Sequence, residues 1–305
     1  MVDQSLAVQT ASHSFRERTL GLVLLMRPKQ WIKNLFVFMP LLFAQQFLNP
    51  VAVGDAFAAF ALFCVAASAT YVVNDIRDRE ADRLHPTKSL KRPIAAGKVS
   101  VPAAIGLLVA LYAVLLVGLF THPAVVGVIA GYIALNVAYS FYLKHQPVLD
   151  IFTIALGFVL RVIAGAVAIG WPLSSWMFIT TLCLALYLAA VKRRQEYRGT
   201  GAETRTVLGR YSLPLIDRYA EMAAICAIVF YSMFVVSVPQ RHMTLTIPFV
   251  LFGLFRYWYV VEVKEGGESP TDALVGDWQL VASVAAWAGM CVWALWPSSD
   301  LVLPF

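Results

Sequence analysis

Charged residues are scarce in this chain. Asp, Glu, Lys and Arg make up 14% of its 305 residues, whereas hydrophobic types make up 60%. A soluble globular domain carries roughly a quarter charged residues. The deficit excludes an ordinary soluble fold and predicts that most of the surface faces lipid. Because the apolar segments follow one another with short gaps, we expect residues 18–305 to form a single membrane domain.

Clustered cysteines and the pattern of a secretory signal peptide are also missing from the sequence. The four cysteines each lie alone inside an apolar run, which excludes a CxxC motif and predicts small apolar packing residues. No apolar stretch precedes Leu20, whereas a secretory signal peptide has one near its start. We therefore expect residues 1–17 to form a mobile cytoplasmic tail.

Nine apolar segments are long enough to cross a membrane, which a helix does in about 20 residues. Turn sequences such as Thr121-His122-Pro123 separate them on one side. The sequence predicts an all-α, polytopic helical bundle whose first span is interrupted by Pro40. The predicted spans are approximately 31–48, 52–73, 101–121, 124–143, 148–170, 174–191, 219–238, 244–261 and 278–297.

Basic residues gather on one side of this topology. Of the 24 Lys and Arg residues, all but Arg161, Arg241 and Arg256 fall in the N-terminal segment or in the loops of that side. Cytoplasmic loops carry such an excess. We therefore expect the plasma (inner) membrane, the N-terminus inside and the C-terminus outside. The same bias explains the net charge of +6 without a nucleic-acid partner.

Carboxylates follow the second predicted span, in the segment 74–82 with the sequence NDIRDREAD. If the helix continues, Asp75, Asp78 and Asp82 lie on one face. Their mutual repulsion calls for a cation, and oxygen ligands favour Mg²⁺ bound by few carboxylates and by substrate phosphates. The alternative is a solvated helix end, because arginines are interleaved with the acids.

Basic residues follow the sixth predicted span, where residues 192–196 read KRRQE. Lys and Arg bind phosphate oxygens directly, and Arg does so with two parallel hydrogen bonds. We therefore expect Lys192 and Arg193 to contact phosphates. For Arg194 and Arg198 the alternative is ordinary anchoring at the cytoplasmic surface.

Two further groups are candidates for substrate binding. In residues 27–34, RPKQWIKN, Lys29 and Lys33 lie on one face of the entering helix and, with Asn34, are expected to reach a phosphate, unless the segment is an interfacial anchor. A charge inside a membrane span costs at least about 2.5 kcal/mol, which marks Arg161. It lies about three turns after Asp150, so we expect a shared cavity. The alternative is an Arg161 paired with a buried acid.

These motifs resemble the UbiA superfamily of intramembrane prenyltransferases, and the resemblance covers the whole chain. Segment 74–82 is similar to the family's first aspartate-rich motif, and residues 91–97, KRPIAAG, to its Arg-Pro-rich segment. The resemblance implies that Asn74, Asp75 and Asp78 hold Mg²⁺ against a diphosphate. The family's second aspartate motif is replaced by the basic residues, which leaves Glu196 as its remaining acid.

Within the superfamily, the motifs together resemble the decaprenyl-phosphate phosphoribosyltransferase branch. This resemblance implies transfer of 5-phosphoribose from phosphoribosyl pyrophosphate to a polyprenyl phosphate, for cell-wall arabinan precursors. The expected catalytic residues are Asp75, Asp78, Asp82 and Lys192. The expected substrate-binding residues are Lys29, Lys33, Asn34, Asn74, Arg83, Lys91, Arg92, Tyr142, Lys144, Asp150, Arg161, Arg193 and Glu196.

Two alternatives stay open. One is prenyl transfer from a prenyl diphosphate to an aromatic acceptor, against which the replacement of acid by base after the sixth span argues. The other is a transporter of anionic lipids or metabolites, which has no need of three carboxylates on one helical face. A homo-oligomer is compatible with the sequence.

Overall fold

The computed structural model describes residues 15–84, 88–200, 207–263 and 270–297. Within these ranges every regular element is a helix, which confirms the predicted all-α class. The elements are α1 Phe15–Leu25, η1 Pro28–Phe38, α2 Met39–Phe43, α3 Pro50–Arg77, α4 Arg79–Leu84, α5 Lys88–Lys91, α6 Val101–Thr121, α7 Pro123–Phe141, η2 Leu143–His145, α8 Leu149–Ala168, α9 Ser175–Thr200, η4 Leu208–Arg210, α10 Leu213–Ser237, η5 Arg241–Thr246, α11 Ile247–Val263, α12 Pro270–Gly276 and α13 Trp278–Ala294.

Seven helical segments in the described ranges are long and apolar enough to cross a membrane. Six correspond to α3, α6, α7, α8, α9 and α10, and the seventh is His242–Val263, which includes α11. The apolar helix α13 is shorter, with 17 residues. The chain is thus a multi-pass membrane protein, but the predicted number of nine spans is not confirmed.

The first predicted span, residues 31–48, is not a continuous α-helix. Its residues form the 3-10 helix η1, then the five-residue α2. Pro40 lies in the first turn of α2, where a missing N–H leaves no helical hydrogen bond unmade. A 3-10 helix has three residues per turn, so Lys29 and Lys33 do not share a face of η1. The prediction based on their α-helical spacing is wrong.

The chain divides into two compact units. The first contains residues 1–28 and 65–114, and the second contains residues 29–64 and 115–305, so that α3 and α6 each contribute to both. The core of the first unit consists of Leu25, Ala69, Val72, Ile94, Val99, Ala104 and Leu111. Most of the predicted tail lies outside the described residues, and α1 begins at Phe15 within its last three positions. The prediction of one membrane domain stays a prediction.

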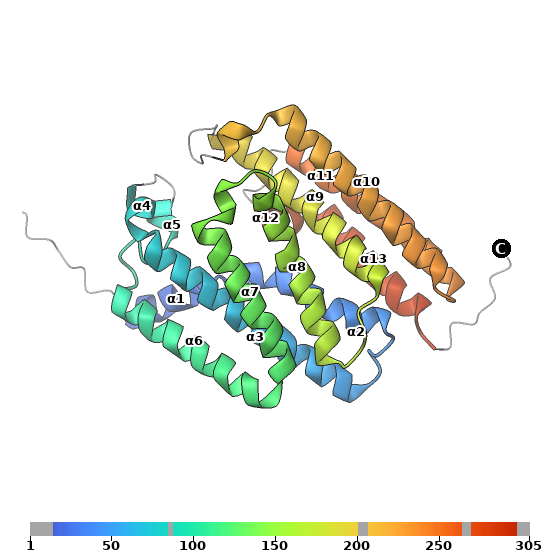
Figure 1. The fold of residues 1–305 in the computed structure, drawn as a ribbon, viewed down its shortest axis with the longest axis horizontal. Helices are drawn as coiled ribbons and strands as arrows, with labels where there is room; N and C mark the ends of the chain where they lie inside the picture. The colour runs from blue at the N-terminus through green and yellow to red at the C-terminus, as the bar shows by residue number, and fades with distance from the viewer. Residues whose placement is uncertain (1–14, 85–87, 201–206, 264–269, 298–305) are drawn as a thin grey trace, which may run out of the picture. The chain divides into compact units, whose positions relative to one another are not determined.

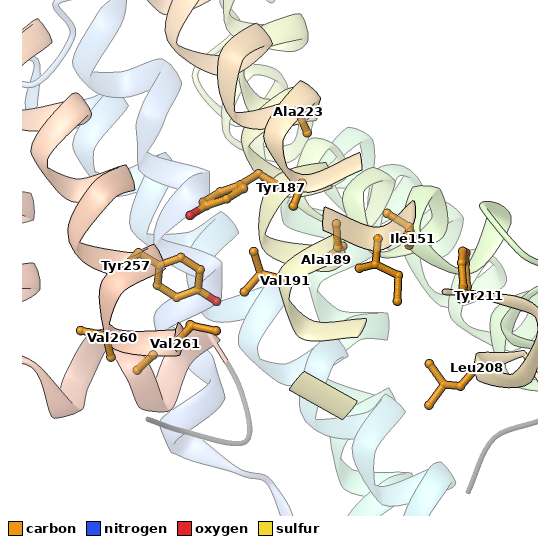
Figure 2. Packing of buried hydrophobic residues seen from close by; sticks show 14 of the residues in the cluster. Ile151, Tyr187, Ala189, Val191, Leu208, Tyr211, Ala223, Tyr257, Val260 and Val261 are labelled. Carbon is orange, nitrogen blue, oxygen red and sulfur yellow. The ribbon is translucent and has the colours of Figure 1, made fainter. Parts of the chain in front are cut away.

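In the second unit, helices that follow one another in the sequence pack side by side. Helix α8 packs against α7 and α9, and α9 runs along α10 in the opposite direction (Figure 1). The largest apolar cluster of the second unit joins α9, α10 and α11 (Figure 2). Within it, the rings of Tyr187 and Tyr257 meet edge to face at 5.7 Å, and Val191 is fully buried. This cluster fixes the part of α9 that leads directly into Lys192.

Candidate active site

The carboxylate of Asp75 is the centre of a buried ionic group in the first unit. Its side chain is 4% exposed, and Oδ1 accepts hydrogen bonds from the guanidinium groups of Arg27 and Arg92, the latter at 2.9 Å. The other oxygen, Oδ2, is buried and makes no hydrogen bond within the part of the chain that the structure describes. Asp75 therefore keeps one acceptor atom available while two arginines fix its orientation.

Arg27 is a residue of this group that the sequence analysis missed. It lies between α1 and η1 with a backbone φ of 54°, and its guanidinium stacks 4.4 Å from the centre of the Tyr71 ring. The Ser68 hydroxyl donates to the carbonyl of Met26 at 3.0 Å, which fixes the backbone just before it. A non-glycine residue at positive φ costs free energy, so the contacts of Arg27 hold it there. One Arg among many basic residues gives no signal of this role.

The aspartate motif remains helical although α3 ends at Arg77 and α4 begins at Arg79. The amide of Asp78 donates to the carbonyl of Asn74, and that of Asp82 donates to the carbonyl of Asp78, both at 2.9 Å. The Asp82 residue is 7% exposed. The side chain of Asp78 is 44% exposed and accepts two hydrogen bonds from Arg77, at 2.8 and 3.0 Å.

Two arginines of the motif form ion pairs with an exposed glutamate. Arg79 and Arg83 both pair with Glu80, at 3.1 and 3.3 Å. Such exposed pairs contribute little to stability. Arg83 and Arg92 were both predicted to bind substrate. Arg83 is 50% exposed and pairs with Glu80, whereas Arg92 contacts Asp75 directly.

The donor set fits a hard divalent cation only in part. Among the described residues, no three or more His, Cys, Asp or Glu side chains are grouped closely enough to form a metal centre. The buried Oδ2 of Asp75 nevertheless offers an oxygen ligand, and Asp78 offers an accessible carboxylate in the next turn. Mg²⁺ characteristically binds one or two carboxylates and completes its shell with water and substrate phosphates. The residues present fit that arrangement rather than an all-protein cage.

The basic group of the second unit is built on the last turns of α9. Arg193 is fully buried, with Nη1 2.6 Å from Glu196 Oε2 and Nε 3.8 Å from Asp150 Oδ2. Lys192 is 31% exposed, and its Nζ lies 3.9 Å from Glu196 Oε1. The structure therefore brings four predicted site residues together: Asp150, Lys192, Arg193 and Glu196. Lys192 is the one that offers an accessible cation.

Tyr211 completes this group and was not predicted. Its hydroxyl donates to Asp150 Oδ1 at 2.7 Å and accepts a hydrogen bond from the amide of Val148 at 2.6 Å. Figure 2 shows its side chain beside Ile151, at the edge of the apolar cluster. Burial is the main cause that raises the pKa of Tyr211 above its ordinary value, so the hydroxyl keeps its proton and donates. A lone Tyr in a loop gives no sequence pattern.

Arg194 connects three helices by ion pairs. Its Nε lies 2.5 Å from Asp217 Oδ1 of α10, and its Nη1 lies 2.5 Å from Glu262 Oε2 of α11. Arg198 adds two hydrogen bonds to Glu262, both at 3.1 Å. Both arginines therefore have specific protein partners, which gives them a structural role beyond surface anchoring.

Arg161 forms a separate polar group inside the second unit. Its Nε donates to Asn34 Oδ1 at 2.7 Å, its Nη1 to the carbonyl of Gly157 at 2.7 Å, and its Nη2 to the hydroxyl of Tyr132 at 3.3 Å. No carboxylate of the described residues pairs with it. The structure does not bring Arg161 and Asp150 together as expected, because each is held by other partners. Asn34 is completely buried.

The other predicted binding residues lie in η1 and η2 or at the ends of α5 and α7. Lys29 is exposed and Lys33 half-buried in η1, and Lys91 is exposed at the end of α5. Tyr142 is 63% exposed after α7, and Lys144 is half-buried in η2. Their positions leave their predicted roles as predictions.

Known proteins resemble this chain over most of its length. A family model described as the UbiA prenyltransferase family matches residues 35–275. Decaprenyl-phosphate phosphoribosyltransferase of Corynebacterium glutamicum is 37% identical over 292 residues, which are 90% of this chain and 87% of that protein. The protein of the same name from Mycolicibacterium smegmatis is also 37% identical, over 88% of this chain and 90% of its own.

A solved structure shares the fold. The UbiA homologue from Archaeoglobus fulgidus bound to GPP and Mg²⁺ aligns with a TM-score of 0.62, over 90% of this chain and 99% of that one. Its sequence is 18% identical, so the likeness concerns the fold alone.

Proposed function

Because the chain belongs to the UbiA prenyltransferase family, we propose that it transfers 5-phosphoribose from phosphoribosyl pyrophosphate to a polyprenyl phosphate and releases pyrophosphate. The observation that carries the proposal is the basic group around Lys192 and Arg193. A prenyl diphosphate has only its diphosphate to bind, whereas phosphoribosyl pyrophosphate has a 5-phosphate as well. An extra set of cations therefore suits phosphoribosyl pyrophosphate better than a prenyl diphosphate. The names of the two bacterial relatives point to the same reaction.

The acidic group is assigned to the leaving diphosphate. Asp75 and Asp78, with Asn74, would hold Mg²⁺, which supplies positive charge where negative charge develops on the departing pyrophosphate. Arg27 and Arg92 hold Asp75 by its Oδ1 and leave Oδ2 for the cation. A carboxylate fixed in this way needs little reorientation when the metal–diphosphate complex binds.

The basic group is assigned to the remaining phosphate oxygens of phosphoribosyl pyrophosphate. Lys192 has the accessible ammonium, whereas Arg193 is buried and holds Glu196 and Asp150. We therefore assign direct contact with phosphate to Lys192. Arg193 would keep the acids of this group paired, so that they do not repel the ligand.

The transfer itself needs no strong general base. An oxygen of the polyprenyl phosphate attacks C1 of the ribose, the bond from C1 to the pyrophosphate oxygen breaks, and the electron pair leaves with pyrophosphate. The second pKa of a phosphate monoester is about 6, so the nucleophile is already ionised near neutral pH. The described residues that carry the proposal bind and orient phosphates rather than abstract a proton.

The lipid substrate explains why the enzyme is a membrane protein. A polyprenyl chain remains in the bilayer, whereas phosphoribosyl pyrophosphate is dissolved in the cytoplasm. We therefore propose that the site opens to the cytoplasmic side of the plasma membrane, on the side with most of the Lys and Arg residues. The lipid product would then supply cell-wall arabinan precursors.

Pyrophosphate release by the purified protein tests the proposal. The assay contains Mg²⁺, phosphoribosyl pyrophosphate and a polyprenyl phosphate, and each component is omitted in turn. We expect release only when all three are present, together with a phosphoribosylated lipid. Release without the lipid would indicate hydrolysis and contradict group transfer.

A second candidate is prenyl transfer to an aromatic acceptor, because the group around Asp75 suits any Mg²⁺–diphosphate. The same assay distinguishes it. Turnover of a prenyl diphosphate with an aromatic acid, and none of phosphoribosyl pyrophosphate, would establish this candidate and leave the role of the acidic group unchanged.

A further inference from the structure

We infer that Tyr211 is a positioning residue, which fixes the Asp150–Arg193 pair and thereby the cation that Lys192 presents to phosphate. This inference rests on the proposed function, since it assigns Tyr211 to the same phosphate-binding group. The residue precedes α10 and follows η4, outside the segments long enough to span the membrane. It therefore links the chain after α9 to the start of α8.

The contacts of the Tyr211 hydroxyl use it as both donor and acceptor. It donates to Asp150 Oδ1 at 2.7 Å, which leaves Oδ2 of the same carboxylate facing Arg193 Nε at 3.8 Å. It accepts from the amide of Val148 at 2.6 Å. One hydroxyl thus determines how the carboxylate is turned, and the carboxylate determines where the guanidinium lies.

Burial makes this arrangement sensitive to the loss of one atom. Asp150 and Arg193 are completely buried, and Tyr211 is 6% exposed. Water does not readily replace a lost donor at a buried carboxylate, and a hydrogen bond to a charged group is among the stronger ones. Without the hydroxyl, Asp150 keeps its interactions with Arg193 and with backbone amides at the start of its own helix. The guanidinium can then follow the carboxylate into a different orientation.

The backbone beside Asp150 depends on the same hydroxyl. Val148 has a φ of 69°, in the left-handed region that β-branched residues rarely adopt. Its amide is directed to Tyr211 in that conformation. A strained residue persists only where its surroundings fix it, and the hydrogen bond to Tyr211 contributes to this. Tyr211 therefore controls both the carboxylate of Asp150 and the turn that begins α8.

The effect reaches Lys192 through Glu196. Arg193 Nη1 lies 2.6 Å from Glu196 Oε2, and the other oxygen of Glu196 lies 3.9 Å from Lys192 Nζ. If Arg193 turns away, Glu196 pairs more strongly with Lys192. The lysine is then less available to a phosphate. Loss of the Tyr211 hydroxyl should weaken binding of the phosphate-rich substrate while the lipid substrate binds as before.

Tyr211→Phe removes the hydroxyl and keeps the ring in the apolar cluster. Tyr231→Phe is the matched control, because Tyr231 is similarly buried and its hydroxyl bonds Thr246 and Trp287 at 2.6 and 2.8 Å, within another apolar cluster. Steady-state kinetics of the full-length protein in detergent give KM for each substrate and kcat. The unfolding temperature is measured with and without phosphoribosyl pyrophosphate. The same measurements are made on Asp150→Asn and on the double variant Tyr211→Phe/Asp150→Asn.

We expect Tyr211→Phe to raise KM for phosphoribosyl pyrophosphate about tenfold, as befits loss of a charge-assisted hydrogen bond. KM for the lipid should change less than about twofold. The shift of unfolding temperature caused by phosphoribosyl pyrophosphate should shrink, whereas Tyr231→Phe should keep it. In the Asp150→Asn background, Tyr211→Phe should add less than about twofold, because residues that act through one another are not additive.

Three results would overturn the positioning role. The first is an unchanged KM for phosphoribosyl pyrophosphate in Tyr211→Phe. The second is an equal rise in KM for both substrates. The third is a double variant in which the effects of the two single substitutions on KM multiply. Failure of the proposed function looks different, since wild-type protein would then turn over a prenyl diphosphate instead. The same variants, assayed with that diphosphate, would still support or overturn the role of Tyr211.

Discussion

Arg161 donates a hydrogen bond from Nε to Asn34 Oδ1 at 2.7 Å, and both side chains are buried in the second unit. The aromatic rings of Phe63 and Tyr132 lie 5.0 Å from the guanidinium carbon, and Asn34 Nδ2 donates to Cys64 Sγ at 3.1 Å. The charge is thus stabilised by neutral acceptors and rings instead of a carboxylate. This makes the amide of Asn34 a principal partner of an intramembrane cation.

Asn34→Leu should lower the free energy of unfolding by about 2 kcal/mol, because it removes an acceptor from a buried charged donor. Asn34→Asp keeps an acceptor and should retain stability closer to wild type. Asn136→Leu is a suitable control, since Asn136 is half-buried and donates to a backbone carbonyl, that of Tyr132. Denaturant unfolding in detergent measures all three. An Asn34→Leu protein as stable as wild type would show that the rings alone stabilise Arg161.

Asp75 and Asp78 should respond differently to the same chemical change. Asp75→Asn leaves Arg27 and Arg92 beside a neutral amide in a buried site, so we expect a loss of both activity and stability, the latter of about 3 kcal/mol. Asp78 is 44% exposed, so Asp78→Asn should keep the unfolding temperature near wild type while kcat falls by orders of magnitude.

Glu80→Gln is the control for this pair of variants. Glu80 is 66% exposed in the same motif and pairs only with Arg79 and Arg83 among the contacts described for it. Its replacement should leave activity within about twofold of wild type, as expected for exposed ion pairs. Full activity of Asp78→Asn in the pyrophosphate assay would contradict the assignment of Asp78 to the metal–diphosphate complex.

Sequence patterns predicted the parts of the molecule that rest on periodicity and local composition. Long apolar runs predicted α3 and α6–α10, and most of their ends lie within a few residues of the predicted ones. The carboxylate spacing in residues 74–82 also fits the helical hydrogen bonds found there. Apolar composition alone did not distinguish the 3-10 helix η1 from an α-helix, because it reports burial rather than the hydrogen-bond pattern.

Partners distant in the sequence were not predictable in the same way. Arg27 binds Asp75, and Tyr211 binds Asp150, across 48 and 61 residues of chain. Each is a single residue with no repeated pattern, and its role follows only from tertiary packing. Asp150 and Arg161 show the converse. A plausible helical spacing suggested a shared cavity, whereas Asp150 contacts Tyr211 and Arg193, and Arg161 contacts Asn34, Gly157 and Tyr132.

Lys192→Ala should raise KM for phosphoribosyl pyrophosphate about tenfold or more, because it removes the accessible cation of the basic group. KM for the polyprenyl phosphate should change much less. Arg198 is nearby in the sequence, 45% exposed and paired with Glu262. Arg198→Ala therefore controls for the general loss of one positive charge. If only the lipid KM rises in Lys192→Ala, Lys192 contacts the polyprenyl phosphate instead of phosphoribosyl pyrophosphate.

Arg194 should matter for stability more than for substrate affinity. Its guanidinium lies between Asp217 and Glu262 and is 6% exposed, so Arg194→Leu leaves two carboxylates close together without their shared cation. We expect a loss of about 2 kcal/mol in the free energy of unfolding. Arg194→Lys should recover only part of it, since an ammonium lacks the planar fork that reaches two carboxylates. Denaturant unfolding measures the loss, and KM for phosphoribosyl pyrophosphate in the folded variant should stay within about threefold of wild type. A selective rise in that KM without destabilisation would instead make Arg194 part of the phosphate-binding group.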